Sequence, residues 1–379
     1  MDVRLSEEQE LLRASAREIL ARECPMALVR EMIGDARGLP EELWKKMAEL
    51  GWMGLPFPEA YGGAGLGLID LVVLLEEAGR VLLPGPFLSS VALAGTAIAL
   101  AGSDAQKRAL LAPIAGGRAR AALALLEAPE RWDAHGVQLE ARRVEGGFRL
   151  RGTKRFVLDA QLADWLIVAA RCEGEPALFS VEARAPGLSI APTALLDGTR
   201  RAALVRCEDV VLPADARLGG GAASLERILD CAKVALCAEM LGGAQRVLEL
   251  SVAYARTREQ FGRPIGSFQA IQHRLADMLV AVEGARSATW YAAWAIDEGE
   301  PEAHTAACMA KAYSSDAYAK IAGDGIQIHG GLGFTWEQDL HLYYRRAKVS
   351  ERLFGDASWN RELVARARID EAEPSQLER

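Results

Sequence analysis

The order of helical and strand-like segments is the feature that most constrains how this chain folds. Apolar residues recur near a period of 3.6 over residues 5–113, which is typical of helices with one buried face. Strand-like patterns begin at about residue 118, and the helical period returns after Gly219–Gly221. An α, β, α order with the longest helices last is uncommon. It predicts an α+β protein with an N-terminal helical domain (1–117), a middle β domain (118–218) and a C-terminal helical domain (219–379).

Local patterns predict individual elements within this order. A Gly146–Gly147 pair, followed by alternating apolar and arginine side chains, predicts a β-hairpin. Residues 164–170 and 203–212 are rich in apolar side chains and predict buried strands. Residues 225–254 carry a helical period and predict one long helix. Prolines and glycines are too dense at 56–65 for helix or strand, so we expect a shaped loop that either binds a ligand or turns a corner.

Composition excludes several classes of function. Of the 379 residues 50% are hydrophobic and 25% are charged, the balance of a globular protein. Acidic residues (52) outnumber lysine and arginine (44), and no long basic run stands out, so nucleic acid is a poor candidate partner. Six cysteines are scattered without a C-x-x-C pair or a histidine at metal-ligand spacing. We therefore expect no disulfides, no metal site and a reducing, cytoplasmic location.

One uncharged stretch, 81–102, is long enough to consider as a membrane span. Pro84, Pro86 and several glycines break it into short pieces, so buried helix ends explain it better. The first twenty residues lack the uninterrupted apolar core of a signal peptide, and we expect neither export nor a membrane. The polar tail, 371–379, is predicted to fray.

The densest chemical signal lies at residues 254–269, where a long helix ends near a glycine and a proline. Three arginines, at 256, 258 and 263, crowd one loop. Guanidinium groups match the geometry of phosphate oxygens, and the next helix should begin near Phe268–Gln269 with free N–H groups. The segment therefore predicts a diphosphate grip. The alternative is a helix C-terminus whose arginines interact with the helix dipole.

A second signal lies at residues 327–335, where Gly330, Gly331 and Gly333 fall within four positions. Such glycines let the backbone approach a flat or anionic ligand closely, although many interhelical loops are glycine-rich without a ligand. His329 on its own is more often a packed core histidine than a ligand.

Three motifs together resemble the acyl-CoA dehydrogenase family: R-x-Q-F-G-x-P-I, Q-I-H-G-G-x-G-F and P-E-x-Y-G-G-x-G-L. The resemblance implies a helical domain, a β-barrel-like domain and a C-terminal domain of the four-helix-bundle type. It also implies FAD bound in a groove between two subunits of a dimer or tetramer. An acyl-CoA thioester would be the substrate, a 2,3-enoyl-CoA the product, and an electron-transfer flavoprotein the electron acceptor.

The resemblance also assigns binding residues. Seven residues would hold the diphosphate and adenosine of a neighbour's FAD: Arg258, Gln260, Phe261, Ile265, Phe268, Gln327 and Gly331. Asp230 and Lys233, three apart on one helix face, correspond to family residues that contact coenzyme A. The alternative for this pair is a surface ion pair.

The chain departs from the family at the catalytic base, which removes the α-proton of the substrate. The position of the family's catalytic glutamate corresponds to Phe354 in this chain. The alternative position that some relatives use for this glutamate corresponds to Ala232. Neither side chain accepts a proton, so no catalytic residue is assigned. Asp356, two residues away, could substitute only if the backbone were shifted; otherwise it is a polar residue at a surface or subunit contact.

The β domain departs from the family too. Where the family has Thr-Glu-Pro-x-x-Gly-Ser-Asp this chain has residues 126–133, beginning Leu126-Glu127-Ala128, and Leu158 replaces a threonine that would bond the flavin ring. A flavin edge left without donors weakens such a site. The residues that would hold a neighbour's FAD diphosphate and adenosine are thus kept, whereas the catalytic base and the side chains that would bond the flavin ring are lost.

Three interpretations follow from this pattern. The first is a supporting subunit of a heteromeric acyl-CoA dehydrogenase for bulky substrates, such as sterol side chains or ring acids. The second is a self-sufficient enzyme with an unusual base, or a related flavin oxidase or monooxygenase. The third is a flavin-free acyl-CoA or protein-binding module that keeps only the fold.

Overall fold

The computed structural model describes residues 5–128 and 130–370. Pro129 and the tail 371–379, which was predicted to fray, lie outside the described residues. The chain forms two compact units. Unit 1 comprises Met1–Arg22, Val72–Leu83 and Lys233–Arg379, and unit 2 comprises Glu23–Leu71 and Pro84–Ala232. The domain boundaries expected at residues 117 and 218 stay a prediction.

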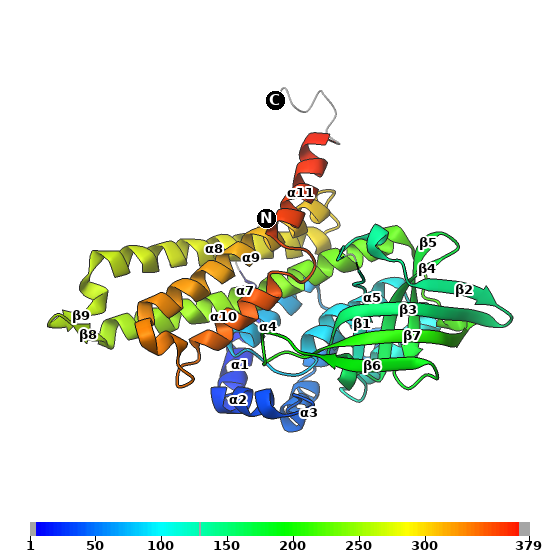
Figure 1. The fold of residues 1–379 in the computed structure, drawn as a ribbon, viewed down its shortest axis with the longest axis horizontal. Coiled ribbons are helices and arrows are strands. Elements are labelled where there is room, and N and C mark those ends of the chain that lie inside the picture. Colours follow the sequence, from blue (N-terminus) through cyan, green and yellow to red (C-terminus); the bar gives the residue numbers. More distant parts are fainter. Residues whose placement is uncertain (1–4, 129, 371–379) are drawn as a thin grey trace. The chain divides into compact units, whose positions relative to one another are not determined.

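Unit 2 is built on one twisted sheet, drawn in green in Figure 1. The strand order is β1–β4–β2–β3–β7–β6, and β5 also pairs with β4. β1 and β2 run parallel to β4, and the other pairs are antiparallel. The strands are β1 (Ala121–Ala124), β2 (Glu140–Val144), β3 (Gly147–Leu158), β4 (Trp165–Cys172), β5 (Glu175–Glu182), β6 (Leu188–Thr193) and β7 (Ala202–Pro213).

The sheet confirms the three strand predictions. The β2–β3 hairpin places Val144 opposite Gly147, so it turns at Glu145–Gly146. Leu166, Val168 and Ala170 of β4 are fully buried, as their unbroken apolar run predicts. The hydrophobic core of the sheet contains Phe148 and Phe179, whose ring centroids lie 5.1 Å apart in an edge-to-face arrangement.

Short helices of unit 2 flank this sheet. They are α2 (Met26–Gly34), α3 (Glu41–Glu49), the π-helix η3 (Leu88–Gly95), α5 (Thr96–Ala101) and α6 (Asp104–Ala115), with short 3₁₀ turns η1 (Trp52–Gly54), η2 (Glu59–Tyr61), η4 (Ala134–Gly136), η5 (Ala160–Leu162) and η6 (Ala214–Ala216). The Ser90 hydroxyl donates to the carbonyl of Ala121 at 3.0 Å and accepts from its N–H at 3.1 Å, which ties η3 to β1.

Two further predictions are resolved in unit 2. The uncharged stretch 81–102 forms η3 and α5 and is largely buried. None of the helices among the described residues is long and apolar enough to cross a membrane. The loop at 56–65 is a tight corner, because the carbonyls of Gly54 and Phe57 accept N–H groups from Ala64 and Gly65.

Unit 1 is helical. It contains most of α1 (Glu7–Glu23), α4 (Leu68–Arg80) and α7 (Ala222–Thr257), together with α8 (Gln269–Asp297), α9 (Ala303–His329), α10 (Leu340–Ser350), α11 (Ala357–Ala365) and the π-helix η9 (Arg366–Asp370). α8 and α9 lie side by side (Figure 1). The helix predicted over 225–254 is confirmed as α7.

Buried ion pairs and a close backbone approach hold these helices together. The carboxylate of Glu76 pairs with Arg286 at 2.5 Å and that of Glu77 with Arg17 at 2.6 Å, and both glutamates are almost fully buried. Buried charges need such partners. A Cβ atom at Gly79 would lie 2.0 Å from the carbonyl oxygen of Glu239 on α7. The crossing of α4 and α7 therefore requires glycine there.

Candidate functional site

The arginine-rich segment forms a hairpin that the sequence did not predict. α7 ends at Thr257, and β8 (Glu259–Gln260) pairs with β9 (Arg263–Pro264). The turn consists of Phe261 and Gly262, both with left-handed backbone (φ 54° and 76°), as in a type I′ turn. Phenylalanine is rare at such a position. Phe261 is 93% exposed, so among the described residues little packing stabilises this strained residue.

The hairpin leaves part of the arginine cluster available to an outside ligand. Arg263 packs over the ring of Phe268 at 4.1 Å, and this ring meets Phe261 edge to face at 6.1 Å. Arg258 and Gln260 are exposed, and among the described residues the Arg258 guanidinium has no hydrogen bond or ion pair. α8 begins immediately after Phe268, as predicted, and no side chain caps its first N–H groups.

The second glycine-rich segment meets the first motif through one ring contact. α9 ends at His329, and η8 (Gly330–Phe334) follows. The imidazole of His329 stacks on Tyr254 at 4.2 Å, and Arg258, the residue after α7, donates its N–H to the Tyr254 carbonyl at 2.8 Å. His329 is buried with Nδ1 2.8 Å from the Gly325 carbonyl, and burial lowers its pKa. It is therefore the packed core histidine that was expected.

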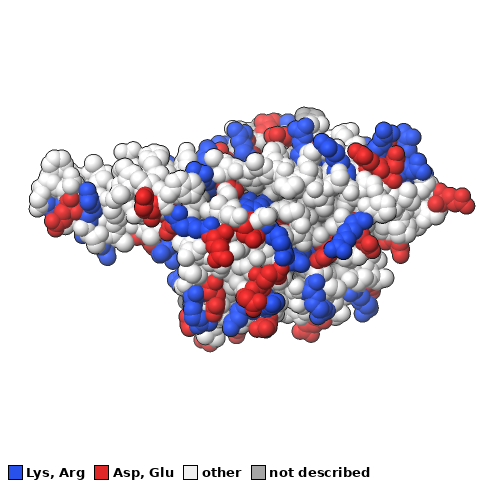
Figure 2. All heavy atoms as spheres, turned by 60° about the horizontal axis from the view of Figure 1, so that its bottom comes forward, with Lys and Arg blue, Asp and Glu red and all other residues white. Residues whose placement is uncertain are grey.

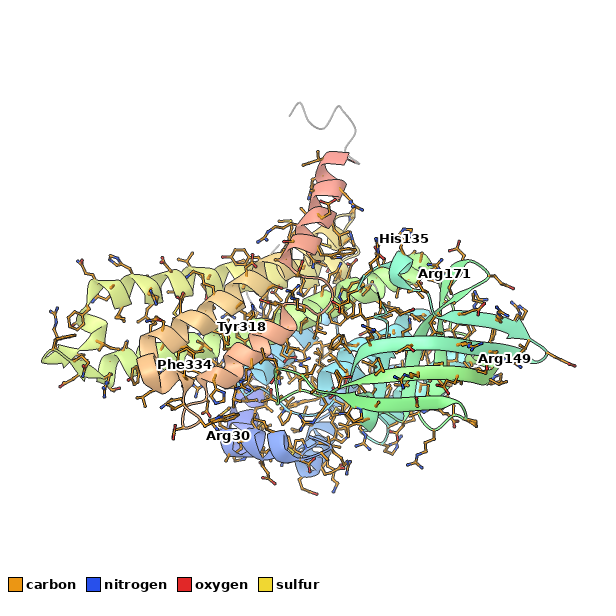
Figure 3. The ribbon with its side chains drawn as sticks, in the orientation of Figure 1. Arg30, His135, Arg149, Arg171, Tyr318 and Phe334 are labelled. Carbon is orange, nitrogen blue, oxygen red and sulfur yellow. The ribbon has the colours of Figure 1, made fainter. Side chains whose placement is uncertain are left out.

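Gln327 and Gly331 are exposed beside this contact. A Cβ atom at Gly331 would meet no atom of the chain within 4 Å, and its φ is not left-handed. Nothing inside the chain requires glycine at this position. An outside group that approaches the backbone closely would require it. Phe334, 75% exposed, lies beyond the end of α9 in the same loop (Figure 3).

The loop that carries the family's base position has a fixed shape in this chain. Phe354 is buried, 3% exposed, and has left-handed backbone (φ 57°). The ammonium of Lys311 on α9 donates to the carbonyls of Glu351 and Gly355 at 3.2 and 2.9 Å and to the Ser315 hydroxyl at 2.7 Å. Asn360 Nδ2 donates to the carbonyls of Gly355 and Asp356, each at 3.0 Å. The backbone is thus held by α9 and α11 rather than by the side chain at 354.

Lys311 is a structural residue of the site loop that motif reasoning missed. It is fully buried, and this burial lowers the pKa of its ammonium to about 8, although Cys237, Asp356 and Glu351 act in the opposite direction. A single lysine within the apolar run Cys308-Met309-Ala310-Lys311-Ala312 was the available signal. Such a lysine on a buried face must have polar partners.

Asp356 has a structural role. Its Oδ1 accepts the backbone N–H of Trp359 at 2.9 Å, so it is the N-cap of α11. Its Oδ2 lies 3.3 Å from Arg352, and the side chain is 41% exposed. The carboxylate is therefore already engaged as a helix cap near the surface.

The positions predicted to contact coenzyme A are not on the surface. Asp230 and Lys233 are 5% and 2% exposed, so the alternative of a surface ion pair was wrong. The sequence spacing gave the shared helix face but not its burial in α7. The Lys233 ammonium lies 3.2 Å from the Cys308 sulfur. Ala232 between them is fully buried.

The β-domain positions that would face a flavin ring carry apolar side chains. Leu126 and Leu158 are 4% and 5% exposed. Next to Leu126, the carboxylate of Glu127 accepts a hydrogen bond from the Lys154 ammonium at 2.5 Å. It also accepts hydrogen bonds from the backbone N–H groups of Gln138 and Leu139, each at 2.9 Å. Burial lowers the pKa of Lys154 to about 8 despite this partner. The loop is well fixed, but its leucines offer the ring no hydrogen bond.

All six cysteines are free and buried in the structure. The expectations of no metal site and of a cytoplasmic location stay predictions. Burial raises the pKa of Cys207 to about 11 and that of Cys237 to about 12, so both are thiols near neutral pH.

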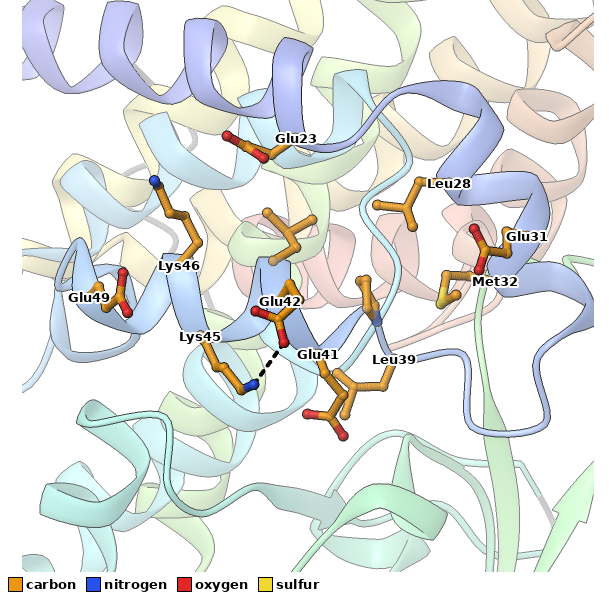
Figure 4. A pocket seen from close by; sticks show the side chains of 12 residues that line it. Glu23, Leu28, Glu31, Met32, Leu39, Glu41, Glu42, Lys45, Lys46 and Glu49 are labelled. Atoms are coloured by element: carbon orange, nitrogen blue, oxygen red, sulfur yellow. Dashed lines mark hydrogen bonds and ion pairs between the residues drawn. The ribbon is translucent and has the colours of Figure 1, made fainter.

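A separate acidic groove lies between α2 and α3 in unit 2 (Figure 4). Its volume is about 500 Å³, and its floor contains Leu28, Met32 and Leu39. Lys45 pairs with Glu42 at 2.8 Å on its rim. None of the predicted site residues lines it, and its five glutamates (Glu23, Glu31, Glu41, Glu42, Glu49) disfavour an anionic cofactor.

Fold and known proteins together define the class of this protein. Residues 6–118 match the acyl-CoA dehydrogenase N-terminal domain and residues 219–369 the C-terminal domain. Acyl-CoA dehydrogenase IpdE2 of Mycobacterium tuberculosis (strain ATCC 25618 / H37Rv) is 35% identical over 92% of this chain and 93% of its own length. These matches define an oxidoreductase that acts on CH–CH bonds, a class that is flavin-dependent in general. The chain belongs to the acyl-CoA dehydrogenase family, as its motifs predicted.

Solved structures agree with this assignment. The ChsE4-ChsE5 complex from Mycobacterium tuberculosis has a TM-score of 0.92 and 29% identity over 98% of this chain and all of that chain. A structure described as "Tcur3481-Tcur3483 steroid ACAD" has a TM-score of 0.88 and 35% identity over 95% and 97% of the two chains. The predicted α+β fold, with helical, β and helical domains, is confirmed.

Proposed function

We propose that this chain is the supporting subunit of a heteromeric acyl-CoA dehydrogenase, which lacks the catalytic base and grips the FAD that a partner subunit uses. The single observation that carries the proposal is Phe354. An apolar ring occupies the family's base position, and it is buried within a loop whose backbone is fixed by Lys311 and Asn360. The general base must therefore come from another chain.

The FAD grip consists of the hairpin and the loop after α9. Arg258 would pair with the diphosphate, and Gln260, Ile265, Phe268, Gln327 and Gly331 would contact the diphosphate and adenosine. The exposed ring of Phe261 would pack against the cofactor or the partner subunit. Phe261 and Arg258 are exposed, and the Arg258 guanidinium has no hydrogen bond or ion pair among the described residues, which suits a ligand held by a second subunit.

The ring side of the chain's own site does not fit a flavin equally well. Leu126 and Leu158 replace side chains that would hydrogen-bond the isoalloxazine edge, and an unpaired buried polar edge costs roughly 1–3 kcal/mol per group. When bound at the partner's ring pocket, FAD supplies the hydride acceptor for α,β-dehydrogenation of the acyl-CoA. This chain's residues contribute cofactor binding and subunit contact. Asp230 and Lys233, both buried, would line the remnant of a coenzyme A site.

An unequal partner has support in the surface and in the related structures. On the face that Figure 2 draws, the end of unit 1 that carries the hairpin has few charged side chains. Exposed apolar residues of unit 1 include Val280 (70%) and Phe334 (75%), which favours a protein interface. The ChsE4-ChsE5 structure is a complex of two named chains. We infer a dimer or tetramer with a second acyl-CoA dehydrogenase-type subunit.

The steroid enzyme among the solved structures favours a bulky sterol-like or ring-acid acyl-CoA as substrate. An electron-transfer flavoprotein would reoxidise the flavin, and the assembly would work in the cytoplasm. The self-sufficient alternative would need Asp356 as base. Its role as N-cap of α11 makes that alternative weaker, and a dedicated variant described below tests it.

Flavin content and turnover test the proposal directly. We expect the chain expressed alone to bind little FAD and to form no enoyl-CoA. Coexpression with a family member that has a glutamate at either base position should give a flavin-loaded, active complex. Arg258→Ala in this chain should release FAD from the complex, whereas the neighbouring exposed Arg256→Ala should not. A homo-oligomer of this chain with full flavin and turnover would refute the proposal.

A further inference from the structure

A cavity of about 650 Å³ lies at one end of the sheet in unit 2, away from every residue assigned above. We call it the arginine cavity, and its polar and aromatic lining includes Arg37, Arg120, Gln161, Trp165 and Arg184. Its volume is within the range of small-molecule sites. We propose that the arginine cavity binds the ADP moiety of a nucleotide.

The three arginines come from segments far apart in the sequence and are set on fixed backbone. Arg37 follows α2, in a turn where the Asp35 carboxylate accepts the N–H of Arg37 at 2.8 Å. Arg201 holds this turn from the sheet side, donating to the carbonyls of Met32 and Asp35 at 2.7 Å each. Arg37 is therefore held at the cavity by bonds independent of its own guanidinium.

Arg120 is fixed in the same way. Its N–H donates to the Asp164 carboxylate at 2.9 Å, and its carbonyl accepts from the N–H groups of Asp164 and Trp165 at 2.8 and 3.2 Å. Trp165 begins β4 opposite Glu182, the last residue of β5. Arg184 follows two residues later and is exposed, with no ion pair among the described residues.

Two side-chain atoms of residues that line this cavity lack a hydrogen-bond partner among the described residues. Within the part of the chain that the structure describes, Arg120 Nε is a buried donor without an acceptor, since Asp164 Oδ2 is 3.9 Å away. Gln161 Oε1 is a buried acceptor without a donor. Buried polar groups are normally satisfied, so one ligand that both accepts and donates fits the cavity better than an apolar one.

The chemistry of an ADP moiety matches this arrangement. Guanidinium groups suit phosphate oxygens, and Arg120 Nε and Arg184 would supply charge-assisted donors. The exocyclic amine of adenine would donate to Gln161 Oε1, and the ring would stack on the half-buried Trp165, against Ile190 and Pro192. The Arg37 guanidinium already pairs with Glu41 at 2.5 Å, and Asp164 is bonded to the Arg120 main chain. The exposed Glu182 is the remaining acidic residue of the lining. The acidic groove between α2 and α3, with five glutamates in its lining, would instead disfavour the phosphate groups of ADP.

Calorimetric titration of ADP into the purified full-length chain tests the proposal. We expect saturable binding of one ADP per chain, with Arg184→Ala and Arg120→Ala each weakening it about tenfold or more. Arg149→Ala removes an exposed arginine from β3 of the same unit (Figure 3) and should have no effect. Glu182→Gln should tighten binding. Unchanged thermal midpoints of the variants would show that folding is intact.

Fragments of the ligand separate its two halves. Adenosine should bind weakly and respond to Gln161→Leu, whereas pyrophosphate should respond to Arg184→Ala and not to Gln161→Leu. A titration with coenzyme A, which contains an ADP moiety, distinguishes a free nucleotide from a coenzyme as the natural source. Whichever of the two binds more tightly and loses affinity in Arg184→Ala is the supported source.

Three results would overturn the proposal. They are ADP binding weaker than about 1 mM, equal weakening by Arg149→Ala and Arg184→Ala, or loss of ADP binding in Arg258→Ala with binding kept in Arg184→Ala. The last result would place ADP in the FAD grip. Because Arg184→Ala should leave FAD retention by the heteromeric complex unchanged, failure here is distinguishable from failure of the proposed function.

Discussion

Buried lysine ammonium groups fix two loops: the loop that carries the family's base position and the β-domain loop that would face the flavin ring. Lys311 holds the loop at Phe354, and Lys154 with Glu127 holds the loop at Leu126. Each lysine is fully buried, and its pKa is lowered to about 8. A lysine whose pKa is lowered by folding releases its proton more readily in the folded state, which makes stability depend on pH.

The pH dependence of Lys311 can be predicted with its sign. Between about pH 8 and its ordinary pKa of 10.5, the unfolded chain binds more protons than the folded chain, so the free energy of unfolding rises with pH. From pH 7 to 9 this contributes roughly 1 kcal/mol. From about pH 8 upward the raised pKa values of the Cys207 and Cys237 thiols, about 11 and 12, oppose the rise, because the unfolded thiols ionise near their ordinary pKa of 9.0. Urea unfolding at pH 7, 8 and 9 measures the effect.

Lys311→Met should remove the contribution of Lys311 to the rise of the free energy of unfolding with pH. The contribution of Lys154 should remain. The matched control is Lys320→Met on the same helix, where the exposed ammonium pairs with Asp324 at 2.6 Å. The control should keep the full pH dependence. An unchanged slope in Lys311→Met would contradict the interpretation.

The Glu127–Lys154 pair predicts a non-additive pair of mutations. Glu127→Gln leaves the fully buried Lys154 ammonium without its carboxylate and should lower the free energy of unfolding by about 3 kcal/mol. Adding Lys154→Met should recover part of this loss, because no buried charge is then left unpaired. Glu130→Gln, exposed in the same loop, is the control. Urea unfolding decides between coupling and simple additivity of the two changes.

At the scale of elements, substitutions of Asp356 test whether this residue is the N-cap of α11 or a catalytic base. Asp356→Asn keeps a side-chain acceptor for the Trp359 N–H, so stability should change by less than about 0.5 kcal/mol and the complex should keep full turnover. Asp356→Ala loses the cap and should cost about 1 kcal/mol. Enoyl-CoA formation by the heteromer and thermal unfolding are the measurements. Loss of turnover in Asp356→Asn alone would support a catalytic carboxylate instead.

The β8–β9 hairpin separates binding from folding. Phe261→Gly replaces an exposed, left-handed phenylalanine with the residue that suits the turn, so the free energy of unfolding should stay within about 0.5 kcal/mol or rise. FAD retention by the complex should nevertheless fall. Leu279→Ala removes another exposed apolar side chain, from α8, and should leave FAD retention unchanged. Flavin absorbance after gel filtration measures retention.

At the scale of the whole molecule, FAD should stabilise the assembly and not the isolated chain. A ligand at a hundred times its dissociation constant adds about 2.7 kcal/mol to the state that binds it. We expect added FAD to raise the thermal midpoint of the heteromer and to leave that of this chain alone unchanged. Equal stabilisation of both samples would mean that one chain forms a complete flavin site.

Much of this architecture was predictable because it depends on local patterns. The period of α7, the apolar run of β4 and the Gly146–Gly147 turn each predicted their element correctly. The β8–β9 hairpin was missed because phenylalanine is unusual in the first position of its turn. Lys311 was missed because its partners are backbone carbonyls some forty residues away, which no motif reveals.

The arginine cavity could not be predicted at all from the sequence. Arg37, Arg120 and Arg184 lie in three segments with no shared motif. The β4–β5 pairing and the hydrogen bonds from Arg201 to the turn after α2 bring them together. The burial of Asp230 and Lys233 was likewise hidden, since their helix spacing is compatible with a surface or a core position. Long-range packing decides such cases.

The pinned loop at Phe354 has an evolutionary consequence. Lys311 and Asn360 hold the loop through backbone carbonyls, so these hydrogen bonds do not require a particular side chain at 354. After a gene duplication, one copy could exchange its glutamate for an apolar residue without losing its fold. Dependence on a sister subunit could thus arise in a single substitution, with the ancestral scaffold left ready for the reverse change.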